Sequence, residues 1–205
     1  MCYDAFMSTH FRSPALPLTT QAAEGLARRR WTVAEIEAMV EAGILLEDER
    51  FELIGGEVVP MSPKGNRHEL VKAALIRLWS RKAPDGIYLV PETTFRLDVD
   101  TFLEPDFVFY NRETGLVNLT GENALLAVEL ADSSLGYDLG RKARLYASFG
   151  IRELWVINAV KLVTQIHRRP GLDGYEEKLT VPPKRFLTPS FAPELAVQLD
   201  GLELI

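Results

Sequence analysis

Cysteine is almost absent from this chain of 205 residues, because Cys2 is the only one and has no partner for an intramolecular disulfide. A protein without disulfides fits a reducing compartment, and we expect it to be cytoplasmic. No apolar run approaches the roughly 20 residues that cross a bilayer, which excludes a transmembrane helix and a membrane partner. Residues 1–18 lack the basic start and apolar block of a secretory signal, so we expect a flexible tail there.

A basic excess is also missing. The chain has 23 basic and 29 acidic residues, a net charge of −6. Proteins that hold nucleic acid by neutralising its phosphates usually show the opposite balance, so the composition argues against DNA as a partner. A local basic surface can nevertheless coexist with acidic residues elsewhere, so the overall charge does not exclude DNA.

The composition is otherwise that of a globular protein, with 47% hydrophobic and 25% charged residues. We expect one domain over 19–205 and find no internal repeat. Apolar periodicity and turn residues predict helices over 32–43, 66–82 and about 139–149. They predict strands over 51–54, 57–59, 87–90 extending through 93–97, 106–110, 124–130, 153–158, 162–167 and 175–179, then an extended arm of about 25 residues. This order favours an α/β sandwich in which helices flank a central mixed sheet.

Glu129 is the first candidate for chemistry, because it lies inside the apolar strand 124–130. A carboxylate in such a strand is costly to bury unless a cation or a metal ion accompanies it. The alternative is a glutamate at the exposed end of the strand, paired with an arginine.

Asp106 is the second candidate, since it opens a strand directly after Pro105. If its strand pairs with that of Glu129, the two carboxylates can share one face of the sheet. Oxygen ligands held together in this way suit Mg²⁺ or Mn²⁺. The alternative is an aspartate that only forms a Pro-Asp turn.

Lys142 is the third candidate, because it falls within the inward apolar stripe of the helix predicted over 139–149. From there its ammonium could reach the two carboxylates, orient an attacking water and stabilise developing phosphorane charge. The alternative is a lysine that buries its stem and exposes its ammonium to solvent.

Three stretches carry a family resemblance: FELIGGEVVPMSP followed by His68, EPDFVFY, and LLAVELADSSLGYDLGRKARLYASFGIRELWVIN. They cover about 31–168, the expected core, and resemble the putative restriction endonuclease domain family, the "Uma-two" proteins of the PD-(D/E)XK nuclease superfamily. The resemblance implies a restriction-endonuclease-like fold, DNA as substrate and a homodimer, since nucleases of this fold often work as dimers.

The resemblance also assigns residues. Asp106 matches the aspartate of the PD element and Glu129 the acid of the second element. The superfamily's lysine usually lies two residues after that acid, where this chain has Ala131, so Lys142 is its expected substitute. Two further site residues follow from the resemblance: Glu52, whose alternative is a pairing on the hairpin edge, and His68, whose alternative is a surface histidine at a helix start.

The sequence thus predicts a metal-dependent nuclease that hydrolyses phosphodiester bonds. Mg²⁺ or Mn²⁺ would be held by Asp106, Glu129 and the Leu130 carbonyl, with Lys142 orienting the attacking water. Two alternatives stay open. The first is a catalytically inactive, dimeric binding or regulatory module of the same fold. The second is a hydrolase that acts on another phosphoester.

Overall fold

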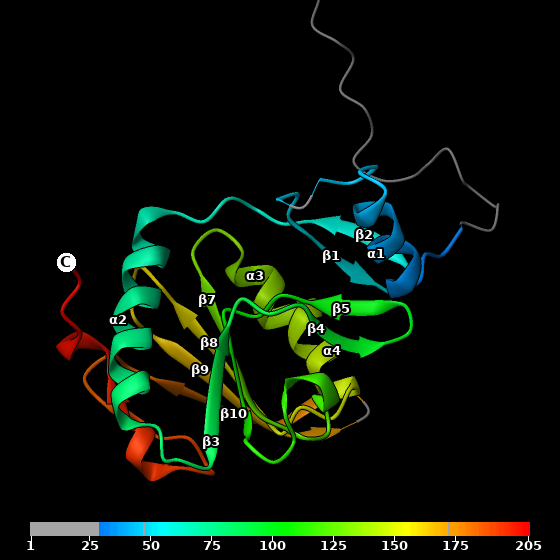
Figure 1. Cartoon of the computed structure of the whole chain (residues 1–205). Coiled ribbons are helices and arrows are strands. Elements are labelled where there is room, and N and C mark those ends of the chain that lie inside the picture. The colour runs from blue at the N-terminus through cyan, green and yellow to red at the C-terminus, as the bar shows by residue number, and fades with distance from the viewer. Residues whose placement is uncertain (1–28, 47, 172) are drawn as a thin grey trace, which may run out of the picture.

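The computed structural model describes residues 29–46, 48–171 and 173–205 (Figure 1). The expected tail over 1–18 lies outside these residues. The main helices are α1 (Val33–Glu41), α2 (Asn66–Lys82), α3 (Leu135–Tyr137) and α4 (Ala143–Ser148). A π-helical segment, η3 (Asp138–Lys142), joins α3 to α4, and three short 3₁₀ segments are η2 (Leu116–Asn118), η4 (Pro193–Leu195) and η5 (Leu199–Gly201). None of the helices in the described ranges is long and apolar enough to cross a membrane.

A six-stranded mixed sheet forms the centre of the molecule, with strand order β10-β9-β8-β7-β6-β3. Its strands are β3 (Ile87–Pro91), β6 (Phe107–Asn111), β7 (Ala124–Ala131), β8 (Glu153–Asn158), β9 (Thr164–Gly171) and β10 (Gly174–Val181). β7 and β8 run parallel, whereas the other neighbours are antiparallel. The expected central mixed sheet is therefore confirmed.

Alternating residues of this sheet supply two separate cores, as the period of two along a strand requires. Phe107, Val128 and Trp155 pack on one face against α2 and the C-terminal segment, where Trp79 donates a hydrogen bond to the Leu195 carbonyl. The residues between them point to the other face and pack against α4. Figure 1 shows the sheet enclosed between α2 and the α3–α4 region.

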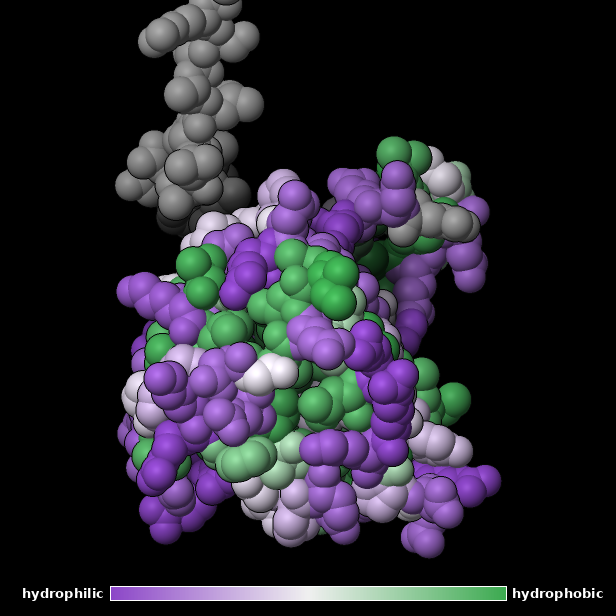
Figure 2. Space-filling view, turned by 90° about the vertical axis from the view of Figure 1, so that its left-hand side faces the viewer, coloured by the Kyte–Doolittle hydropathy of each residue, from purple (hydrophilic) through white to green (hydrophobic). Residues whose placement is uncertain are grey.

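The side of the molecule that carries α2 is mostly hydrophilic. Figure 2 shows polar residues over much of this face, with smaller groups of hydrophobic residues between them. Arg77, on the outer side of α2, pairs with Glu203 across 2.7 Å. Because both side chains are largely exposed, this pair adds little to stability.

A second, four-stranded sheet packs under α1 with the order β2-β1-β5-β4. It comprises β1 (Phe51–Ile54), β2 (Glu57–Pro60), β4 (Phe95–Asp98) and β5 (Thr101–Leu103). The predicted hairpin is present, and Gly55 and Gly56 adopt φ values of 58° and 79° that a two-residue turn requires. A capping box is also present, since Thr32 and Glu35 bond each other's backbone N–H groups at the start of α1.

Three expectations about elements were wrong in detail. The strand expected over 87–97 is two strands in different sheets, because Glu92 takes a left-handed φ of 47° and breaks the chain between β3 and β4. The third helix begins earlier, at Leu135, and contains the π-helical segment. The C-terminal arm includes a small sheet, β11 (Phe186–Leu187) with β12 (Val197–Gln198), whose residues join the core beside α2.

His167 on β9 should make the stability of the protein pH-dependent. Its ring is 1% exposed, lies 5.5 Å from the ring of Tyr175, and has no hydrogen-bond partner on either nitrogen within the described ranges. Burial, helped by Lys178, lowers the pKa of His167 to about 4. Between its ordinary value of 6.5 and about 4, the unfolded chain therefore binds a proton that the folded protein does not, so stability falls as pH falls.

We expect His167→Phe to remove this dependence. At pH 5 the wild-type protein should have lost about 2 kcal/mol that the variant retains, relative to pH 7.5. Urea unfolding at the two pH values measures the difference. Parallel loss of stability in both proteins would assign the effect to other groups.

Candidate active site

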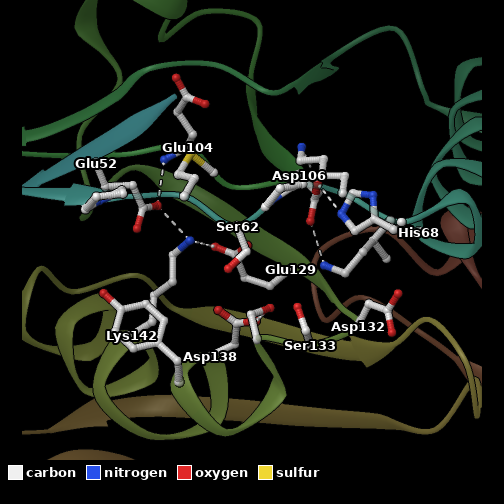
Figure 3. Close-up of a pocket in the computed structure, with 18 of the residues that line it drawn as sticks. Glu52, Ser62, His68, Glu104, Asp106, Glu129, Asp132, Ser133, Asp138 and Lys142 are labelled. Carbon is white, nitrogen blue, oxygen red and sulfur yellow. Dashed lines mark hydrogen bonds and ion pairs between the residues drawn. The ribbon is translucent and has the colours of Figure 1, made fainter. Parts of the chain in front are cut away.

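A cleft of about 340 Å³ lies between the two sheets and is lined by the polar side chains that the sequence singled out. Its walls come from β1, the loop before α2, the start of β6, the end of β7 and the segment from α3 to η3. Figure 3 shows Asp106 and His68 on one side of this cleft and Glu52 and Lys142 on the other, with Glu129 between them.

Asp106 directly precedes β6 and lies next to the end of β7, because Phe107 pairs with Val128. Its Oδ2 accepts a hydrogen bond of 2.7 Å from the Leu130 N–H, and its Oδ1 lies 3.0 Å from both Lys64 Nζ and His68 Nε2. Burial alone would raise the pKa of Asp106, but His68, Lys64 and the Leu130 N–H together hold it below the ordinary value. Asp106 is therefore a buried, ionised carboxylate.

Glu129 lies near the end of β7, which is buried along its whole length. Its Oε1 accepts a hydrogen bond of 2.5 Å from the Tyr146 hydroxyl and lies 2.9 Å from Lys142 Nζ. Burial raises the pKa of Glu129, Lys142 opposes the rise, and the neighbouring carboxylates Asp138 and Asp106 add to it. Neither of the two contacts involves Oε2, which leaves that oxygen for another partner in the cleft.

Lys142 lies between two carboxylates, 2.7 Å from Glu52 Oε1 and 2.9 Å from Glu129 Oε1, and is only 4% exposed. Burial would lower the pKa of Lys142, but Glu129 and Glu52 outweigh it and raise the pKa. Its ammonium is thus charged and points into the cleft rather than into solvent. Glu52 is buried on β1, where its Oε1 also accepts the Glu104 N–H at 3.0 Å.

The structure brings all the predicted residues together in this one cleft: Glu52, His68, Asp106, Glu129, Leu130 and Lys142. The alternatives of an exposed Glu129, a snorkelling Lys142 and a surface His68 do not describe the fold, because each of these side chains is buried. Their roles in catalysis remain predictions.

Sequence reasoning missed three residues of the site. The Tyr146 hydroxyl donates to Glu129, and Asp138 is buried in the cleft wall, where it accepts the Ser134 hydroxyl at 2.5 Å. The third is Lys64 in the loop before α2, whose Nζ lies 3.0 Å from Asp106 Oδ1. The signal for the first two was their spacing, since Asp138, Lys142 and Tyr146 are four residues apart and share a helix face.

The cleft holds more carboxyl groups than lysines. Four buried carboxyl groups, Glu52, Asp106, Glu129 and Asp138, face Lys64 and Lys142. The described part of the chain has no group of three or more His, Cys, Asp or Glu side chains arranged to hold a metal ion. Mg²⁺, however, is commonly held by one or two carboxylates with water and substrate phosphate, so the donors Asp106, Glu129 and the Leu130 carbonyl fit a hard divalent cation.

Comparisons with known proteins identify a family and a fold. A family model described as "Uma2: Putative restriction endonuclease" matches residues 34–200. The structure is similar to the crystal structure of a putative nuclease belonging to DUF820 from Anabaena variabilis, with a TM-score of 0.60 and 14% sequence identity. The match covers 82% of this chain and 95% of that chain, and at this identity it shows the fold alone. A search of curated proteins gives no match.

Proposed function

We propose, since the chain belongs to the Uma2 putative restriction endonuclease family, that it is a metal-dependent nuclease that hydrolyses phosphodiester bonds. The observation that carries the proposal is the position of Lys142, whose buried ammonium lies 2.9 Å from Glu129 in the cleft that also holds Asp106. A buried ammonium among several carboxyl groups can stabilise the negative charge of a substrate phosphate that binds there together with a metal cation.

In this proposal, Asp106, Glu129 and the Leu130 carbonyl would hold Mg²⁺ or Mn²⁺. When bound, the ion supplies positive charge for the phosphoryl oxygens and lowers the pKa of a coordinated water. The Leu130 N–H fixes Asp106 Oδ2, and Tyr146 fixes Glu129 Oε1, so both carboxylates are held in place before the substrate arrives.

Lys142 orients the attacking water and donates to the negative charge that develops on the phosphoryl oxygens. The water oxygen forms a bond to phosphorus as the bond from phosphorus to the 3′ oxygen breaks. The attacking water loses one proton and the departing 3′ oxygen gains one, so the products carry a 5′ phosphate and a 3′ hydroxyl. Glu52, 2.7 Å from the Lys142 ammonium, helps to hold that ammonium in the cleft from the side opposite Glu129.

The direct test is cleavage of plasmid and single-stranded DNA with Mg²⁺ or Mn²⁺. We expect nicked or linear products that depend on the divalent ion and disappear when EDTA removes it. Cleavage that continues unchanged in EDTA would contradict metal dependence, and intact DNA with every ion tested would contradict the nuclease assignment.

A second candidate is a binding module of the same fold without catalysis. It is favoured by Ala131 in the place where the superfamily's lysine is usual, and by the net charge of −6. Calorimetric titration with Mg²⁺ and Mn²⁺ separates the two, because a module without catalysis needs no metal site. A homodimer also remains a prediction.

A further inference from the structure

A second group of charged residues lies beside Asp106 and shares Lys64 with the cleft described above. Glu92 follows β3, and its N–H donates to the Asp106 carbonyl at 3.3 Å. Three cations from separate segments converge on Glu92 Oε1: Lys64 pairs with it directly, Lys72 Nζ lies at 3.1 Å, and an Arg50 guanidinium nitrogen lies at 3.7 Å. One carboxylate oxygen thus collects positive groups from the chain before β1, the loop before α2 and α2 itself.

Each of these cations has a further acidic partner. The additional pairs join Arg50 to Glu104 at 3.5 Å, Lys64 to Asp106 at 3.0 Å and Lys72 to Glu69 at 2.6 Å. Glu92 is therefore the fourth carboxylate of the group and the one that all three cations share. If its side chain moved away, each cation would still have one carboxylate partner, and the group could accept one new singly charged anion.

Two features would allow the Glu92 side chain to move away from the three cations. Its side chain is 38% exposed, so the carboxylate has a path to solvent. Its φ of 47° lies in the left-handed region that a non-glycine residue seldom adopts, and such backbone conformations gather at functional sites.

We propose that Arg50, Lys64 and Lys72 form a binding subsite for a backbone phosphate of nucleic acid, which Glu92 occupies in the free protein. A phosphodiester group carries the same single negative charge as the carboxylate it would replace, so the exchange conserves the local charge. Lys64 also contacts Asp106, which places the subsite directly beside the phosphate to be cleaved. The proposal rests on the proposed function and names the group of the substrate that binds there.

This subsite also explains how a chain with a net charge of −6 could hold a polyanion. The glutamate prevents binding of stray anions, and only a ligand with further contacts in the cleft would displace it. Lys72 and Glu92 are suited to testing, because neither of their side chains contacts Asp106, Glu129 or Lys142 in the pairs described.

The experiment measures binding of a fluorescent DNA duplex by anisotropy, in EDTA so that no cleavage occurs, over a series of salt concentrations. Glu92→Gln removes the competing charge and should tighten binding several-fold. Lys72→Met keeps the apolar stem, removes the ammonium, and should weaken binding about tenfold while reducing the salt slope by about one. Arg77→Met on the outer side of the same helix is the matched control and should change neither quantity.

The outcomes separate this proposal from the proposed function. If the wild type cleaves DNA but Glu92→Gln and Lys72→Met bind like Arg77→Met, the subsite is wrong and the nuclease stands. If no cleavage occurs but the two variants shift affinity in opposite directions, the subsite stands and the nuclease assignment fails. If Glu92→Gln and Lys72→Met changed the affinity for thymidine monophosphate but not the affinity for the duplex, the assignment to nucleic acid would be overturned.

Discussion

Lys142→Met should lower the rate of DNA cleavage by roughly 10²- to 10³-fold, the usual loss when one donor to the developing charge is removed. The binding of Mg²⁺ should be kept or strengthened, because Lys142 now pairs with the Glu129 oxygen at 2.9 Å and thereby competes with a cation. Steady-state cleavage and calorimetric titration measure the two quantities. This combination of effects distinguishes a residue that acts on the substrate from one that only completes the metal site.

The same substitution should also destabilise the fold, because it leaves Glu52 and Glu129 buried without their shared cation. Removing one partner of a buried ion pair typically costs about 3–5 kcal/mol. The double variant Glu52→Gln/Lys142→Met removes one charge of each sign and should recover much of that loss. A well-folded double variant that cleaves DNA at the wild-type rate would show that Lys142 has no catalytic role.

Apolar periodicity and turn residues predicted most of the helices and strands correctly, because these elements are determined by residues close together in the sequence. The helix over 66–82 follows from apolar residues such as Val71, Leu75 and Trp79 on one face, and the structure has α2 at these positions. β7 follows from a run that is apolar except at Glu129, as is typical of a strand covered on both faces. The resemblance to a nuclease family added Glu52 and His68 to the candidates Asp106, Glu129 and Lys142, and the family is confirmed.

What the sequence could not predict depends on contacts between distant segments. The break at Glu92, whose φ of 47° lies in the left-handed region, replaces one expected strand by two, and the cations paired with Glu92 come from α2 and the chain before β1. The π-helical segment Asp138–Lys142 could not be predicted either, because apolar periodicity assumes the 3.6 residues per turn of an α-helix. Such segments occur often at functional sites, and here it contains both Asp138 and Lys142 of the cleft wall.

Tyr146 shows the limit of the apolar stripe as a signal. Its ring is fully buried among core residues, as the stripe predicts, yet its hydroxyl donates to Glu129. Periodicity identifies the buried face of a helix but does not say which polar atom lies at the end of a buried ring. That information requires the position of β7 relative to α4.

Asp106→Asn should strongly reduce cleavage for a different reason, the loss of a charged ligand of the proposed metal ion. We expect a fall on the order of 10³-fold, equivalent to about 4 kcal/mol of transition-state stabilisation. The affinity for Mg²⁺ should fall as well, in contrast to Lys142→Met. The side chain keeps its size, so it leaves no cavity beside β6.

Some loss of stability is expected in Asp106→Asn, because an amide offers one acceptor oxygen where the carboxylate offers two. Either the Leu130 N–H or the pair of Lys64 and His68 then loses an acceptor, which costs about 1–3 kcal/mol. The exposed residue Asp98 provides the matched control, Asp98→Asn, which should cleave like the wild type. Thermal unfolding establishes that both variants are folded at the assay temperature.

Two outcomes would contradict this prediction. If a folded but inactive Asp106→Asn protein bound Mg²⁺ with wild-type affinity, Asp106 would act on the substrate rather than on the metal. If the variant retained cleavage, the proposed mechanism would be overturned.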